Sequence, residues 1–423
     1  MSNTQLLEKR KNYTIFESAL ACVIFIVLTL LFSICYSSLP VEIRANKPFY
    51  YIAQFLIEAM FGVAAWVVAT TRKIDLLEAS GFKKKISGKM VGLGFLIALV
   101  SIVMFGSLTN YFLVILEILG YTPRSAGIEI NNFGVYLVYV VTTCIAPALF
   151  EEMLFRGTIA SGFKSFGKKT AIICSALIFM LMHGSPDQTI HQFIVGLILG
   201  YLFISSGNIW LGVIVHFFNN FISITDVYIL TALSTGENSD ATVVETNGFM
   251  VVIGVIIAIL LAVGGYYIIK KLLDEILNED ARVNGSVQNS VALQIADSSG
   301  QANPDLNQNT VLENKTENMQ ADLQSVTSLA NEEDRFKIDS KEFEISKEEF
   351  EGSKDSEAKT DSEVLAQNAE VGATAPAGEN GEVNQKTDGG EKKISMSTMI
   401  LFVLSGGYLV FEWLIALISG FMG

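Results

Sequence analysis

The sequence predicts an all-α polytopic membrane protein: a bundle of about 8 core transmembrane helices plus one extra C-terminal helix after a disordered linker. Two observations predict this class. Hydrophobic residues make up 51% of the 423 residues, and the mean hydropathy is +0.44, too apolar for a water-soluble chain of this length. Apolar runs of about 20 residues, the length that crosses a bilayer, recur along the chain.

Nine helices account for these runs. The first run lacks a small-residue cleavage site and is long, so we expect a retained membrane helix and not a cleaved signal peptide. The third is long for a single span. The helices are predicted at 17–37, 49–71, 89–119, 132–156, 168–184, 188–205, 208–231, 248–272 and 396–421.

Composition divides the chain into four parts: N-terminal transmembrane helices at 1–131, a transmembrane core at 132–273, an acidic linker at 274–394 and a last helix at 395–423. The linker is rich in acidic and small polar residues with few aromatics. Such a segment cannot bury enough apolar surface to offset its conformational entropy, which predicts disorder. The net charge of −14 belongs to this segment. A solvated linker is the main interpretation, and docking of a cytoplasmic partner is the alternative.

Lysines and arginines gather in alternate loops, which indicates orientation. Basic residues precede the first helix, fill the second loop at 72–89, follow the fourth helix and flank the linker. The N-terminus is therefore expected in the cytoplasm and the C-terminus outside. The short loops favour a multi-pass protein of a prokaryotic plasma membrane. The basic run Lys83–Lys85 is expected to set topology and face lipid, so no nucleic-acid partner is expected.

The four cysteines all lie in apolar stretches, and none has the spacing of a zinc ribbon or a redox pair. They predict neither a disulfide framework nor a cysteine metal site. They are Cys22, Cys35, Cys144 and Cys174.

Charged residues inside membrane segments cost about 2.5–3.5 kcal/mol each on insertion scales, so those that persist mark function. Glu152 and Arg156 are four residues apart and share a helix face, where they can pair. Glu151 points about 100° away and stays available to activate water. The alternative is a structural salt bridge at a helix end.

Two further motifs supply histidines. His183 follows Phe179 by one turn and precedes a helix-breaking turn at 184–187. His216 and Asn220 again share one face, with Asn219 as an alternative partner. A packed core histidine is the competing interpretation for His183.

These side chains suit two kinds of chemistry. His183, His216 and Glu151 are candidate ligands for zinc, with a fourth position left for water. They could equally bind water without a metal. No HExxH motif occurs, so the arrangement of soluble zinc proteases is absent.

Three motifs in this order, EEMLFRG, FMLMHG and HFFNN, resemble those of the CAAX-processing and bacteriocin-processing (CPBP/Abi) family of intramembrane metalloproteases. The stretches HQFIVGLILG and SGNIW between them are also similar to that family. The resemblance covers roughly 140–222. The acidic segment and the helix after it depart from the family core and touch no motif residue.

The resemblance implies a membrane endopeptidase that cleaves a membrane-associated peptide or protein, with Glu151 as the base that activates water. It carries over Glu152, Arg156, His183, His216 and Asn220 as site residues, and leaves open both zinc and prenylated CAAX substrates. A non-catalytic immunity or scaffold protein of the same fold is the alternative. A transporter would show internal helix repeats, and none is seen.

Polar side chains on apolar helices must satisfy one another or water, because lipid offers no partners. We therefore expect Glu151, His183 and His216 to share one cavity, open to the cytoplasmic side. His191 is expected to be accessible to solvent or to lie near the substrate, and not to be a ligand. Gly196 and Gly200 form a GxxxG pattern that predicts close helix packing.

Overall fold

The structure is a computed structural model that describes the chain except residues 1–9, 11, 124–129, 235–247, 299–393 and 423, and except the side chains of 286–298. The described residues are mostly helical and contain no strand; one isolated bridge joins Arg10 to Ile74. Two compact units divide the chain: residues 1–292 with 391–423, and residues 293–390.

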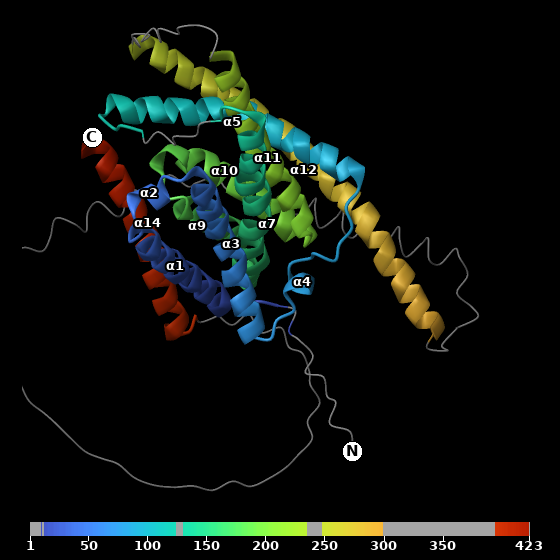
Figure 1. Cartoon of the computed structure of the whole chain (residues 1–423). Coiled ribbons are helices and arrows are strands. Elements are labelled where there is room, and N and C mark those ends of the chain that lie inside the picture. The colour runs from blue at the N-terminus through green and yellow to red at the C-terminus, as the bar shows by residue number, and fades with distance from the viewer. Residues whose placement is uncertain (1–9, 11, 124–129, 235–247, 299–393, 423) are drawn as a thin grey trace, which may run out of the picture. The chain divides into compact units, whose positions relative to one another are not determined.

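All nine predicted helices are present among the described residues (Figure 1). The N-terminal helices are α1 (Ile15–Ser37), α2 (Val41–Arg44), α3 (Lys47–Thr71), α4 (Leu76–Ala79) and α5 (Gly88–Ile118). The fourth predicted helix consists of α6 (Phe133–Tyr139), η1 (Val140–Ile145), α7 (Ala146–Glu152), η2 (Met153–Ala160), α8 (Ser161–Phe163) and η3 (Lys164–Phe166). The rest are α9 (Lys168–Met182), η4 (Pro186–Gln188), α10 (Thr189–Ser206), α11 (Ile209–Ser234), α12 (Gly248–Ser298) and α14 (Met396–Met422).

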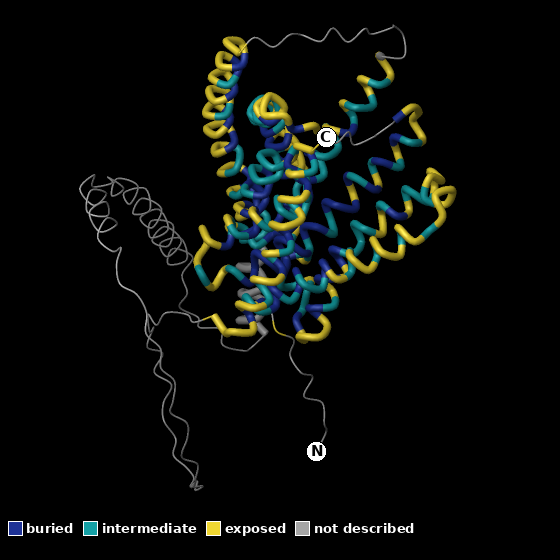
Figure 2. The backbone as a smooth tube through the Cα atoms, turned by 90° about the vertical axis from the view of Figure 1, so that its left-hand side faces the viewer, coloured by how far each residue is buried: buried dark blue, intermediate teal, exposed yellow. Residues whose placement is uncertain are grey.

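Eight of these segments are long and apolar enough to cross a membrane, so the predicted class of polytopic membrane protein is confirmed. The ninth, α9, has 15 residues, fewer than the roughly 20 that a span needs. Large apolar side chains are exposed on the outer faces of the helices, among them Trp66, Leu260 and Val403. Figure 2 shows the buried positions along the inner sides of the packed helices. This is the distribution expected where lipid surrounds the bundle.

The helices pack through small residues and apolar clusters. A Cβ atom added at Gly196 of α10 would lie 3.0 Å from the Cα atom of Ala176 on α9, so the predicted close packing at the GxxxG pattern is present. Phe61, Phe155 and Phe179 meet in one buried cluster that joins α3, η2 and α9. The extra C-terminal helix α14 contributes Leu409 to the same cluster, and Figure 1 shows it beside α1.

A buried carboxylate anchors the start of α1. Glu17 is fully buried and accepts hydrogen bonds from Arg10 at 3.0 Å and from Arg72 at 3.1 Å. Its other oxygen accepts from the Thr14 backbone N–H at 2.7 Å, which caps the helix. The end of α3 is thereby tied to the beginning of α1.

The predicted boundary between the core and the linker at 274 is wrong, because α12 continues to Ser298. Ile276 of this extension is fully buried, and Leu273 and Leu277 pack around the same apolar cluster. Polar side chains also hold the extension: Asp280 accepts a hydrogen bond from Asn208 at 2.7 Å, and Glu279 accepts one from Ser87 at 2.7 Å. The remainder of the predicted linker, 299–393, lies outside the described residues.

Candidate active site

The two motif glutamates lie on α7, a short α-helical piece between two π-helical segments, η1 and η2. π-helical turns widen a helix and occur mostly at functional sites. Pro147 stands near the start of α7. A proline inside a helix lacks the N–H that would bind the carbonyl four residues earlier, here that of Thr143, and its ring crowds that carbonyl. The break in the helix therefore follows from Pro147.

The carbonyl of Thr143 receives a different donor. Asn220 of α11 donates its side-chain N–H to the Thr143 oxygen at 2.9 Å. Its own side-chain oxygen accepts a hydrogen bond from Asn219 at 3.2 Å. The irregular backbone before the glutamates thus fixes the orientation of a motif amide from another helix.

Glu152 and Arg156 form the ion pair that their spacing predicts. The Nη1 atom of Arg156 donates to Glu152 Oε1 at 2.8 Å, and both side chains have 0% exposure. The Nη2 atom of Arg156 donates to the carbonyl of Gly196 at 3.2 Å. The guanidinium also lies 4.5 Å from the centre of the Phe179 ring. A charge buried this deeply needs these partners.

His216 is held by the same carboxylate. Its Nδ1 atom lies 3.0 Å from Glu152 Oε1, and its Nε2 atom lies 3.9 Å from Glu151 Oε2. A carboxylate only accepts, so Nδ1 carries a proton. In the neutral imidazole the Nε2 lone pair then points toward Glu151.

His183 shows the same arrangement. It caps the C-terminus of α9, and the positive φ of +57° at Gly184 ends the helix directly after it, as the predicted turn requires. Its Nδ1 atom lies 2.8 Å from the carbonyl of Phe179, which can only accept. The Nε2 atom of His183 is therefore also the one that remains for a ligand. The ring of Phe179 packs between the two imidazoles, with centroids 4.8 Å from His183 and 5.8 Å from His216.

Glu151 is the motif carboxylate that stays available. It is 6% exposed, and its Oε2 atom accepts no hydrogen bond from the described residues. It lies outside the pair that Glu152 forms with Arg156, as the helical geometry predicts. A buried carboxylate oxygen without a donor is costly, so the site favours a donor from a ligand or water.

Glu151, His183, His216 and Asn220 line one cavity of ≈ 530 Å³. The expectation that these motifs meet in a single cavity is therefore met. Asn219 and His191 line it as well. Glu152 and Arg156 do not line the cavity. Glu152 contacts His216, and Arg156 contacts the carbonyl of Gly196 on α10.

Glu58 of α3 also lines this cavity, and the sequence motifs do not include it. Its carboxyl group lies within hydrogen-bonding reach of that of Glu151. The signal that could have found it is a lone charged residue in the apolar run FLIEAMFG, since such residues inside membrane segments mark functional sites.

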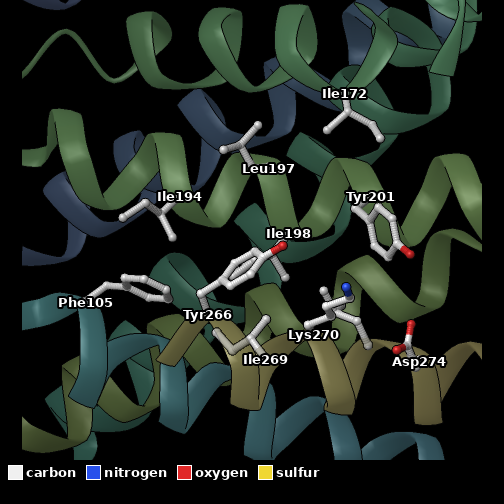
Figure 3. Close-up of a pocket in the computed structure, with 11 residues that line it drawn as sticks. Phe105, Ile172, Ile194, Leu197, Ile198, Tyr201, Tyr266, Ile269, Lys270 and Asp274 are labelled. Atoms are coloured by element: carbon white, nitrogen blue, oxygen red, sulfur yellow. The ribbon is translucent and has the colours of Figure 1, made fainter. Parts of the chain in front are cut away.

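A second cavity, of ≈ 460 Å³, has a different character. Apolar side chains of α5, α10 and α12 form most of its wall, and Lys270 and Asp274 stand at one end (Figure 3). No motif residue lines it, so the polar chemistry of the protein belongs to the cavity around Glu151.

His183, His216 and Glu151 are the candidate ligands that the sequence offers for a metal ion. Among the described residues, no group of three or more His, Cys, Asp or Glu side chains gathers closely enough to hold one. The free Nε2 atoms and the unpartnered Glu151 oxygen instead match the needs of a bound water molecule, which donates two hydrogen bonds.

The comparisons with known proteins agree with the motifs. The family model described as "Type II CAAX prenyl endopeptidase Rce1-like" matches residues 133–222, about a fifth of the chain. No curated protein and no solved structure gives a match. The matched segment runs from α6 into α11 and contains every motif residue of the cavity. The site-bearing segment of this membrane protein is thus similar to the Rce1-like family of CAAX endopeptidases.

Proposed function

We propose that the protein is an intramembrane endopeptidase that hydrolyses a peptide bond of a membrane-associated or hydrophobic substrate. One observation carries this proposal: Glu151, buried and with an oxygen that accepts no hydrogen bond, faces the Nε2 atom of His216 across 3.9 Å inside a polar cavity. That gap is longer than a direct hydrogen bond. A water molecule about 2.8 Å from each atom can contact both.

The water is the nucleophile. Its protons point to Glu151 Oε2 and to His216 Nε2, which leaves an oxygen lone pair for the substrate carbonyl. Glu151 takes a proton as the new C–O bond forms, and the carbonyl oxygen becomes an oxyanion. Glu151 then gives that proton to the leaving nitrogen as the C–N bond breaks. Proton transfer by a positioned side chain contributes about 10²–10⁴-fold to such a rate.

The developing oxyanion needs donors fixed in advance. Asn220 uses one N–H for the carbonyl of Thr143, and its second N–H is available to the oxyanion. His183, oriented by the carbonyl of Phe179, accepts a second water or a substrate N–H at Nε2. Glu152 and Arg156 keep His216 in one tautomer.

The basic end of the bundle is proposed to face the cytoplasm, with the protein in the plasma membrane of a prokaryotic cell. Lys84 binds the carbonyl of Ser206 and lies 4.0 Å from Asp280. The basic second loop, the α10–α11 turn and the polar part of α12 are therefore at one end of the bundle. Basic residues favour the cytoplasmic side, which supports a cytoplasmic N-terminus and an external C-terminus.

Purified full-length protein incubated with a fluorogenic library of hydrophobic peptides tests the proposal. Internal cleavage of a subset is expected, and Glu151→Gln should abolish it. Binding of peptides without cleavage by a correctly folded wild-type protein would favour the scaffold alternative.

A further inference from the structure

A third cavity, of ≈ 330 Å³, adjoins the site on its other side. Glu58, Glu151 and His183 line both cavities and so stand between them. The rest of the wall comes from α1, α3, the end of α9 and α14. Most of it therefore lies outside the segment that the family model matches.

The charged side chains in the lining of this cavity are acidic. Glu58, Glu151 and Glu412 line it, and no lysine or arginine does. The Oε2 atoms of both Glu58 and Glu151 are buried and accept no hydrogen bond from the described residues. Two carboxylates in contact repel each other where water is scarce. A cation beside this pair in the cavity relieves the repulsion and supplies a donor to the buried oxygens.

The extra helix α14 holds Glu412 at this cavity. Trp413, the next residue, donates its indole N–H to Thr189 Oγ1 at 3.0 Å, and Leu409 is buried one turn earlier. Tyr408 lies within hydrogen-bonding reach of Glu412. A charged residue in the middle of a membrane helix costs about 2.5–3.5 kcal/mol on insertion scales, so a cation-binding role accounts for its place here.

The walls favour an organic cation. Among the described residues no three acidic or histidine side chains come close enough to hold a metal ion. The side chains of Phe25, Ile26, Leu181 and Met182 form an apolar wall beside the carboxylates. A methylene chain that ends in an ammonium group matches both surfaces, because its stem packs on apolar side chains while its head reaches the charges.

We propose that the third cavity binds a primary ammonium group of the substrate, placed between Glu58 and Glu412 and beside the scissile bond. The inference rests on the proposed endopeptidase function, and it adds a preference for substrates that carry a positive charge near the cleavage site. The ammonium is supplied either by a lysine side chain or by a free amino terminus.

A binding measurement tests the cavity without using proteolysis. The probe is dansylcadaverine, whose five-carbon stem ends in an ammonium, and its neutral control is the N-acetyl derivative. Titration of the full-length protein in detergent, followed by dansyl emission, should show at least tenfold tighter binding of the ammonium form. Glu58→Gln and Glu412→Gln should each reduce that binding about tenfold, whereas Glu412→Asp keeps it within threefold.

Glu117→Gln is the matched control, because Glu117 is an exposed glutamate of a membrane helix that lines neither cavity. It should leave binding of the probe unchanged. Size-exclusion profiles identify variants that do not fold. If a variant does not fold, the comparison of the two probes on wild-type protein tests the proposal instead.

Cleavage of matched peptides separates the two sources of the ammonium. One series replaces a lysine near the cleaved bond by norleucine, and the other acetylates the amino terminus. One of the two changes should lower kcat/KM at least tenfold in wild-type protein and not in Glu412→Gln. That change identifies which group supplies the ammonium.

Equal binding of both probes, with proteolysis intact, refutes the cavity assignment alone. Absence of proteolysis with selective ammonium binding refutes the proposed function and leaves the assignment standing.

Discussion

The Nδ1 atom of His216 and the Oε1 atom of Glu152 lie 3.0 Å apart, although 64 residues of chain separate them. The same carboxylate oxygen accepts from Arg156 at 2.8 Å. One buried acidic group therefore fixes the tautomer of a histidine from α11 and neutralises an arginine on its own helix segment. The neighbouring Glu151 lies outside this pair and lines the cavity, so the two adjacent glutamates have different surroundings.

Glu151→Gln should lower peptide hydrolysis at least about 100-fold, because glutamine cannot take a proton from water. The substitution keeps the size of the side chain, so the unfolding temperature should change little. Turnover numbers on one fluorogenic peptide, beside the control Glu117→Gln, measure the effect. A variant that retained more than a tenth of wild-type turnover would remove Glu151 as the base.

Arg156→Met should destabilise the fold by about 3–5 kcal/mol, because it leaves the fully buried Glu152 without its cation. Lys83→Met is the matched control: Lys83 also pairs with a glutamate, Glu78, yet the two side chains are 60% and 37% exposed. Thermal unfolding in detergent should show a clear loss for the first variant and little change for the second. Similar unfolding temperatures for both would show that the buried pair is not a stabilising element.

The sequence is sufficient for the helices and for the Glu152–Arg156 pair, because hydropathy and the i, i+4 spacing are local properties. Contacts between side chains of distant helices could not be predicted in this way. Nothing local pairs Glu58 of α3 with Glu151 of α7, and the carbonyl that Asn220 binds becomes available only through the π-helical break. The helical extension beyond 274 was also missed, because its polar residues suggested a linker, while Asn208 and Ser87 supply their partners from elsewhere.

Gly212→Ala should disturb the support of His216. A Cβ atom at Gly212 would lie 2.7 Å from Glu152 Oε2, closer than real Cβ contacts, so the carboxylate must move. Overpacking of this kind costs about 1–3 kcal/mol, and we expect turnover to fall about tenfold or more. Gly92→Ala on α5 is the control, since its Cβ meets open space. Unchanged kcat in Gly212→Ala would show that the position of Glu152 is not critical.

Removal of metal ions should leave turnover within twofold of its original value, since His183, His216 and Glu151 do not gather as a metal site. Dialysis against 1,10-phenanthroline, with metal content measured by mass spectrometry before and after, makes the test. Loss of activity that zinc restores and magnesium does not would show that these side chains close around a metal during the reaction.

Pro147→Ala should make the helix before the glutamates more regular and should lower turnover. Alanine restores the N–H and removes the ring that crowds the Thr143 carbonyl, so the η1 segment can return to α-helical geometry. We expect the unfolding temperature to stay or rise. Turnover should fall about tenfold, because the Thr143 oxygen turns away from Asn220 and its amide loses the 2.9 Å contact that orients it.

A double-mutant cycle separates this effect from a general loss of packing. Asn220→Ala removes the amide that Pro147 is argued to orient, so the double variant Pro147→Ala/Asn220→Ala should be no slower than Asn220→Ala alone. The kcat values of the wild type, both single variants and the double variant give the coupling. Additive losses would mean that Pro147 acts on the site by a route other than Asn220, and the role of the helix break would need another explanation.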